Sequence, residues 1–200
     1  MHVTPAVIAS GSNHGLLKSY VESFLRQDGL PWYAASSAAP YKGDATLDDV
    51  KANRDNRLQL FMFGESNFVP VYSTEEPGTV KMFAPHPVSN REEMRDQTGY
   101  RIRKCLSYDQ KQYVSGQAQS TTGCVIFRAV EAYLNYMEAA CMKNNGNVTG
   151  KAAEYWRAVR IRAGVDPDFT KTIAATDLSK ENELDKYKGE NEMIDVTLLN

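Results

Sequence analysis

The chain has 200 residues, 42% of them hydrophobic, which is enough for one domain with a real core. Its 23 basic and 25 acidic residues give a formal charge of −2 without a block of one sign, which argues against a nucleic-acid or anionic-membrane partner. No apolar run approaches the ~18 residues of a membrane span, and the first residues lack the charged start and apolar core of a signal peptide.

The cysteines and histidines give no metal or catalytic pattern. Three cysteines are an odd number without metal-ligand spacing, which argues against a disulfide framework, although one pair could still bridge: Cys105, Cys124 and Cys141. Three histidines lie far apart and lack carboxylate or cysteine partners at ligand spacing: His2, His14 and His86. We therefore expect no metal and no cofactor.

The first predicted element is a helix over residues 16–25, which Asp28-Gly29 then ends. Its apolar residues recur at helical spacing: Leu16, Leu17, Tyr20, Val21, Phe24 and Leu25. A loop follows over residues 30–43. It is unusual because it places Trp32, Tyr33 and Tyr41 in backbone that should face solvent.

The chain after this loop is predicted to be a short helix, a short strand and a long connection. Thr46 before two aspartates is typical of an N-cap with acid in the first turn, which predicts a helix to about Ala52. Residues 58–62 alternate in the period of a strand, with Leu58, Leu60 and Met62 on one side. Residues 65–90 are rich in Pro, Gly and Ser and predict a long irregular connection.

The clearest pattern is a pair of helices joined by a turn-forming segment, residues 143–150. In the first helix the apolar residues follow one face: Ile126, Val130, Tyr133, Leu134, Met137, Ala140 and Cys141. In the second they are Ala152, Tyr155, Trp156, Val159 and Ala163, and Gly164 stands where the helix should end. The pattern predicts an antiparallel helix hairpin with Trp156 in its core. Residues 170–189 beyond it are polar and weakly patterned.

Five segments resemble, in order, those of SusD/RagB-type outer-membrane nutrient-binding lipoproteins. Residues 127–139 are similar to the family's "IRYAEVLLMYAEA" helix, and residues 155–165 to the "VRxRAG" helix that follows it. Residues 41–44 match its Tyr-x-Gly-Asp, residues 53–58 its "NRDPRL" and residues 98–104 its "SGYxxxK". The ordered set is much more specific than any one member.

The resemblance runs from about residue 10 to residue 165 and implies a mainly α fold. We expect a helix-hairpin core with long irregular loops and a few short strands, as part of the SusD-like helical-repeat fold. The expectation is one domain over residues 1–200, an internal piece from the carboxy-terminal half of a larger lipoprotein. The chain departs from the family at Asn56, where proline is usual, and at Arg157, where asparagine is usual.

As implied by the resemblance, the protein is a non-catalytic binder on the outer face of a bacterial outer membrane, held by a lipid anchor absent from this chain. It would deliver a starch-like or other polysaccharide or oligosaccharide to a TonB-dependent, SusC-like transporter. Two alternatives stay open: a peptide-binding or protein-interaction module of the RagB kind, and an enzyme such as a glycoside hydrolase. The enzyme rests only on scattered carboxylates: Asp44, Asp48, Asp49 and Asp55. These are expected instead to cap a helix and pair with Arg54 and Arg57.

The aromatic residues carry the binding hypothesis. Sugars present flat C–H faces on which Trp or Tyr can stack, while Asn, Asp or Arg nearby bond the hydroxyls. The candidate ligand-binding residues are therefore Trp32, Tyr33, Tyr41, Asn53, Arg54 and Tyr72. The alternative is that these rings only anchor long loops to the helical core.

Overall fold

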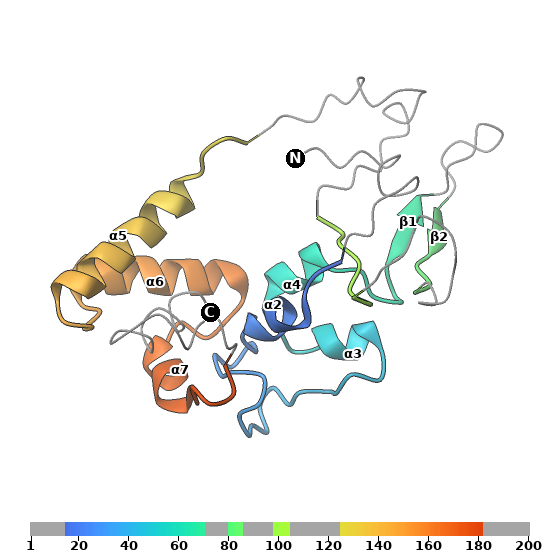
Figure 1. Ribbon diagram of the computed structural model, residues 1–200, viewed down its shortest axis with the longest axis horizontal. Helices are drawn as coiled ribbons and strands as arrows, with labels where there is room; N and C mark the ends of the chain where they lie inside the picture. The colour runs from blue at the N-terminus through green and yellow to red at the C-terminus, as the bar shows by residue number, and fades with distance from the viewer. Residues whose placement is uncertain (1–14, 71–79, 86–97, 105–124, 182–200) are drawn as a thin grey trace. The chain divides into compact units, whose positions relative to one another are not determined.

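The computed structural model describes residues 15–70, 80–85, 98–104 and 125–181 (Figure 1). Within them the chain forms six α-helices and one two-stranded antiparallel sheet, which confirms the mainly α fold with short strands. None of the helices in this part of the chain combines the length and apolar character needed to cross a bilayer.

The chain forms two compact units, and each is described by itself. The first draws its described residues from Met1–Lys18, Gly43–Val50 and Gln59–Val125. The second draws them from Ser19–Lys42, Lys51–Leu58 and Ile126–Asn200. The expectation of one domain over residues 1–200, with a core at about 10–165, stays a prediction.

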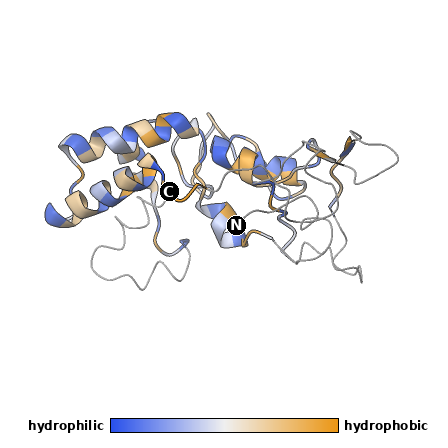
Figure 2. Cartoon of the chain, turned by 90° about the horizontal axis from the view of Figure 1, so that it is seen from above, coloured by the Kyte–Doolittle hydropathy of each residue, from blue (hydrophilic) through white to orange (hydrophobic). Residues whose placement is uncertain are grey.

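The predicted helix hairpin is the main element of the second unit. Helices α5 (Ala129–Lys143) and α6 (Gly150–Ala163) lie side by side (Figure 1) and are joined by a turn in which Asn145 and Gly146 have φ of 51° and 88°. Both helices carry hydrophilic and hydrophobic residues along their length (Figure 2), because each buries one face only. The buried cluster consists of Met137, Ala152, Ala153, Trp156 and Phe169. The hairpin and the core position of Trp156 are confirmed.

The predicted end of α6 agrees with the structure, whereas the predicted start of α5 does not. Gly164 ends α6 as predicted, since it is left-handed with φ 72° and its N–H bonds to the Ile161 carbonyl at 3.0 Å. The predicted start at Ile126 is wrong. Arg128 at the N-cap of α5 is extended (φ −131°, ψ 141°), so Ile126 precedes the helix and is 92% exposed.

Helix α7 (Phe169–Ala175) lies in a segment that was predicted to be weakly patterned. Asp168 caps it by accepting from the Thr170 N–H at 3.1 Å. Its first residue, Phe169, stacks on Trp156 with ring centroids 4.2 Å apart and planes 8° from parallel. The helix thus depends on a cap and on tertiary contacts such as this stack and the bond from Arg160 to the Thr172 hydroxyl at 2.9 Å, and neither produces a periodic apolar pattern.

Helix α2 (Lys18–Ser23) is shorter than the predicted helix over residues 16–25. At its start the Leu16 N–H donates to the Tyr100 carbonyl at 2.8 Å, so this residue pairs as extended chain. At its end the Val21 carbonyl accepts from the side chain of Arg54 at 2.8 Å. Backbone groups that a longer helix would use are therefore bonded elsewhere.

Helix α3 (Leu47–Lys51), in the first unit, confirms the predicted N-cap. The Thr46 hydroxyl accepts from the Asp49 N–H at 3.0 Å and donates to the Asp49 carboxylate at 2.8 Å. The Glu65 carboxylate accepts from the N–H groups of Leu47 and Asp48 at 3.0 and 2.9 Å. The backbone N–H groups of Leu47, Asp48 and Asp49 in the first helical turn thus each donate to a side chain.

Removing this cap gives a modest stability effect. Thr46→Ala is expected to lower the free energy of unfolding by about 1 kcal/mol, because the Asp49 N–H loses its acceptor. Thr46→Ser, which keeps the hydroxyl, is the control and should stay within about 0.5 kcal/mol of the parent in urea unfolding. Equal losses in both variants would contradict the capping role.

Two segments differ from the prediction for residues 58–90. Helix α4 (Asn56–Phe61) replaces the predicted strand, because the Asp55 carboxylate accepts from the Arg57 N–H at 2.7 Å and starts a helical turn. The segment expected to be irregular contains strands β1 (Phe68–Pro70) and β2 (Val80–Met82), paired antiparallel. Three-residue strands are too short to give a recognisable alternation.

Candidate functional site

Three of the four aromatic residues predicted to bind a ligand, all three in the second unit, cluster in one loop, residues 30–43, which we call the aromatic loop. The Trp32 ring lies 5.8 Å from the Tyr33 ring and 5.6 Å from the Tyr41 ring, at interplanar angles of 79° and 68°. All three are half-buried. The cluster therefore has the edge-to-face geometry that aromatic rings prefer, with part of its surface open to solvent.

Asn53 holds the second half of the aromatic loop. Its backbone is left-handed (φ 58°), and its side-chain amide donates to the Pro40 carbonyl at 3.0 Å. Its own carbonyl accepts from the Gln27 N–H at 2.8 Å. Asn53 thus fastens the segment before Tyr41 to the chain next to α2.

Arg54 lies beneath the aromatic loop and is 1% exposed. Its guanidinium donates to three backbone carbonyls at the end of α2 and just after it. The accepting carbonyls are those of Val21 at 2.8 Å, Glu22 at 3.2 Å and Phe24 at 2.6 Å. The guanidinium carbon also lies 5.8 Å from the centre of the Tyr41 ring. Burial lowers the pKa of Arg54 to about 10, so the group remains charged at neutral pH. These contacts make it a support for the loop.

Tyr33 ties the first half of the loop to residues after α7. Its hydroxyl donates to the Glu181 carboxylate at 2.5 Å and accepts from the Asp177 N–H at 2.8 Å. The Lys180 ammonium lies 5.3 Å from the centre of its ring. Burial, followed by the hydrogen bond to Glu181, raises the pKa of Tyr33, so its hydroxyl stays protonated and serves as a donor.

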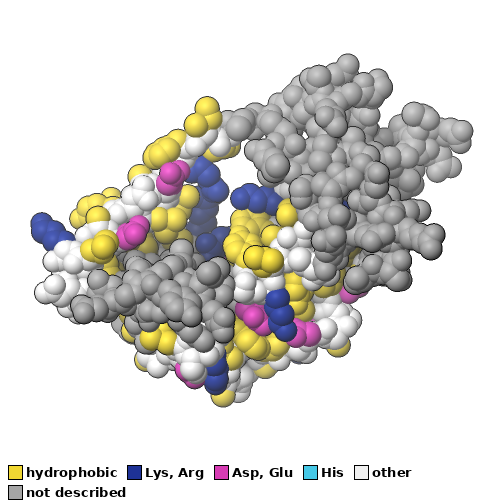
Figure 3. Space-filling model, viewed as in Figure 1, with side chains coloured by type: hydrophobic (Ala, Val, Ile, Leu, Met, Phe, Trp, Pro, Cys, Tyr) yellow, Lys and Arg dark blue, Asp and Glu magenta, His cyan; other side chains and the backbone are white. Residues whose placement is uncertain are grey.

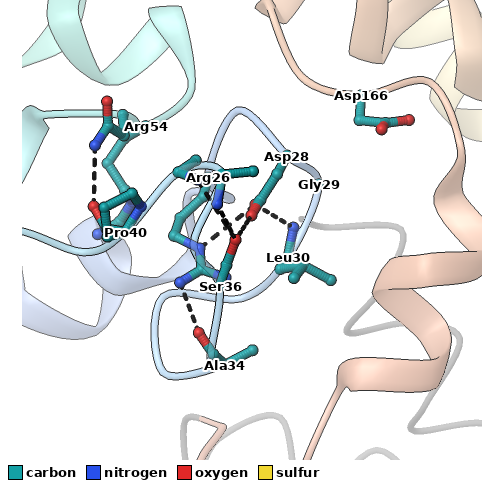
Figure 4. Close-up of polar contacts among 12 residues, drawn as sticks. Arg26, Asp28, Gly29, Leu30, Ala34, Ser36, Pro40, Arg54 and Asp166 are labelled. Carbon is teal, nitrogen blue, oxygen red and sulfur yellow. Dashed lines mark hydrogen bonds and ion pairs between the residues drawn. The ribbon is translucent and has the colours of Figure 1, made fainter.

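Sequence reasoning missed a buried network at the base of the loop (Figure 4). Arg26, 1% exposed, donates to the Ala34 carbonyl at 2.6 Å and lies 3.5 Å from the Asp28 carboxylate. Asp28 also accepts from the Leu30 N–H at 3.2 Å and from the Ser36 hydroxyl. The sequence signal that could have indicated this network is the charged residue Arg26 directly after the apolar residues at positions 24 and 25. The network fixes the path of the loop on both sides of Trp32.

The remaining predicted residues divide between described and undescribed parts of the chain. Tyr72 lies outside the described residues, so its role in ligand binding stays a prediction, and the three histidines, for which no role is predicted, lie outside them as well. Asp55 pairs with Arg57 at 2.5 Å as expected, whereas Arg54 bonds backbone carbonyls instead of an acid. Within residues 15–70, 80–85, 98–104 and 125–181, no three His, Cys, Asp or Glu side chains form a group that could hold a metal ion.

Comparison with known proteins adds the family. The model of the SusD family matches residues 6–192. The chain belongs to the SusD family. Members of this family are nutrient-binding proteins, generally non-catalytic and typically associated with the outer membrane. Neither the curated proteins nor the solved structures give a match.

The SusD-family match covers both the aromatic loop and the α5–α6 hairpin, since both lie between residues 6 and 192. Of the five segments that suggested the family from the sequence, residues 53–58, 127–139 and 155–165 belong to the second unit and residues 98–104 to the first. The match also includes the residues that support the loop, Arg26, Asn53 and Arg54.

Proposed function

We propose that this chain binds an extracellular glycan through the aromatic loop and delivers it to a TonB-dependent, SusC-like transporter of the outer membrane. The observation that carries the proposal is Trp32, half-buried at the centre of the cluster between Tyr33 and Tyr41. Its indole N–H has no hydrogen-bond partner among the described residues, so it can donate to a sugar hydroxyl.

The candidate residues divide into two roles in this proposal. Trp32 and Tyr41 contact the sugar, because their rings give a flat apolar surface for its C–H face. Tyr33, Asn53 and Arg54 are positioning residues, since their polar groups bond to the protein. A loop held in place before binding loses less conformational entropy when the ligand arrives. The function is binding and release, with no bond made or broken.

Substituting Trp32 tests the proposal. The full chain is run in gels containing amylopectin, xylan, glucomannan, arabinan or polygalacturonate, and its migration is compared with that in an empty gel. We expect retardation by at least one polymer and a loss of about tenfold or more in affinity for Trp32→Ala, because a loss of about 1.4 kcal/mol of stacking is tenfold. Trp32→Phe, which keeps a ring, should lose less.

Tyr20→Ala is the matched control, because Tyr20 is also an aromatic residue of the second unit, 44% exposed, outside the loop. Its retardation should equal that of the parent. Equal weakening in Tyr20→Ala and Trp32→Ala would remove the loop from the site. Failure of the parent to bind any polymer, together with binding of peptides, would replace glycan by peptide as the cargo.

A further inference from the structure

A turn over residues 27–29, directly before the aromatic loop, is bonded through its backbone to a segment far along the chain in the second unit. That segment is where α6 ends and α7 begins, residues 160–172, which we call the α6–α7 corner. The carbonyls of all three turn residues accept hydrogen bonds from the corner. The bonds run from the Asp166 N–H to Gln27 at 2.8 Å, from the Lys171 ammonium to Asp28 at 3.4 Å and from the Thr172 hydroxyl to Gly29 at 2.5 Å. The corner therefore fixes the backbone of the turn.

Thr172 and Arg160 form the buried centre of this contact. Thr172 is 0% exposed, and its hydroxyl accepts from the Arg160 guanidinium at 2.9 Å. Arg160 also donates to the Asp166 carbonyl at 2.7 Å. Lys and Arg side chains stand out on the face drawn in Figure 3, as is usual for these residues, whereas Arg160 is 3% exposed. Because a buried guanidinium needs hydrogen-bond acceptors, Arg160 keeps its bond to Thr172 and directs the hydroxyl proton of Thr172 to the Gly29 carbonyl.

The corner and the turn pack directly against each other. Gly29 is left-handed with φ of 82°, and a Cβ atom at this position would lie 2.6 Å from a guanidinium nitrogen of Arg160. Beside the turn, one buried apolar cluster joins the chain before it to the end of α6. The cluster consists of Leu25, Ala163 and Val165. Close packing on this side leaves the turn little freedom to move against the corner.

The side chain of the turn bonds to the aromatic loop. The Asp28 carboxylate accepts from the Leu30 N–H at 3.2 Å and from the Ser36 hydroxyl (Figure 4). Leu30 and Ser36 stand on either side of Trp32 in the chain. Asp28 thus has its carbonyl bonded to the corner and its carboxylate bonded to the loop, and it links the two.

We infer that the α6–α7 corner is a positioning element of the glycan site, with Arg160, Lys171 and Thr172 as its positioning residues, an inference that rests on the proposed function. The corner holds the turn, and the Asp28 carboxylate holds the loop around Trp32. The three residues act through the turn and do not touch the sugar. A loop held in one conformation loses less entropy when a ligand binds, so loosening the turn lowers the affinity although every ring remains.

Replacing Thr172 tests the inference. Thr172→Val keeps the branched shape of the side chain and removes the hydroxyl that donates to the Gly29 carbonyl, and Thr172→Ser restores the hydroxyl. In gels of the polymer that retards the parent, Thr172→Val should lose about fivefold in affinity and Thr172→Ser no more than about twofold. The gels are run at a temperature at which circular dichroism shows each variant to be fully folded, so that lower stability does not reduce binding.

A second readout follows Trp32 without a ligand. The chain has two tryptophans, and fluorinated tryptophan gives each of them a fluorine NMR resonance, of which Trp32→Phe identifies one. Thr172→Val should shift or broaden the Trp32 resonance, because the indole samples more conformations, and Thr172→Ser should restore it. Thr170→Val is the matched control, since the Thr170 hydroxyl donates to the Asp168 carboxylate at 2.5 Å within the cap of α7. It should leave both the affinity and the resonance as in the parent.

The outcomes separate this inference from the proposed function. If the parent binds a polymer and Thr172→Val changes neither the affinity nor the resonance, the inference is wrong and the proposed function stands. A changed resonance with unchanged affinity, or an equal loss of affinity in Thr172→Val and Thr172→Ser, would also overturn it. If the parent binds no polymer, the proposed function is wrong, and the resonance alone decides whether the corner positions the loop.

Should Thr172→Val unfold, Lys171→Met decides. The Lys171 side chain is 42% exposed, so its replacement leaves the core intact and removes the bond to the Asp28 carbonyl. The Trp32 resonance and the affinity should then change in the same direction as expected for Thr172→Val, by a smaller amount. A Lys171→Met chain that matches the parent in both would overturn the inference.

Discussion

Arg54→Ala is expected to lower the free energy of unfolding by about 3 kcal/mol or more, because each buried acceptor left without a donor costs about 1–3 kcal/mol. The carbonyls of Val21 and Phe24 lose the guanidinium that bonds them at 2.8 and 2.6 Å. The substitution also leaves a cavity below the Tyr41 ring. Urea unfolding followed by circular dichroism measures the change, with the slope checked for constancy.

Two further variants separate the causes of this loss. Arg54→Lys keeps the charge, but a single ammonium cannot reproduce the planar fork of the guanidinium, so most of the loss should remain. Arg162→Ala, which removes an exposed arginine of α6, should change stability by no more than about 0.5 kcal/mol. A loss for Arg54→Ala no larger than that of Arg162→Ala would show that the carbonyls find other donors.

Trp156→Ala is expected to have a similar effect, a loss of about 3–5 kcal/mol, as is usual for a large buried ring. Trp156 is 2% exposed and stacks on Phe169 at 4.2 Å, so the substitution opens the hairpin core and frees α7. Thermal unfolding should show a lowered midpoint, with a smaller shift for Trp156→Phe. Ile161→Ala, 64% exposed on α6, is the control, and a midpoint drop as large as that of Trp156→Ala would contradict the core assignment.

The elements that the sequence predicted are those whose information is local. The hairpin has a repeating apolar face on each helix and Gly164 at its end, and α3 has a side-chain cap at Thr46. The elements that were missed depend on tertiary partners or are too short for a pattern. Helix α7 needs Trp156 to cover Phe169, and a strand as short as β1 cannot show an alternation.

For the candidate site, too, local features were predictable from the sequence and long-range contacts were not. Trp32, Tyr33 and Tyr41 share one loop, so their proximity followed from spacing alone. The division of roles did not, because the partner of Tyr33 is 148 residues away at Glu181 and those of Arg54 are 30 to 33 residues upstream. Polar residues near aromatic ones in the sequence were expected to face the ligand, and in the structure their polar groups are bonded to the protein.

The second unit is assembled from separate stretches of chain, and this has a consequence for how the protein is made. The Gln27 carbonyl accepts from the Asp166 N–H at 2.8 Å, and the Gly29 carbonyl from the Thr172 hydroxyl at 2.5 Å. Contacts of such high sequence separation slow folding, because the intervening chain must lose entropy before they form. During synthesis the aromatic loop leaves the ribosome well before these partners exist. Its rings then remain exposed until residues up to about 181 have been translated, and a chaperone that shields apolar surface would act in that interval.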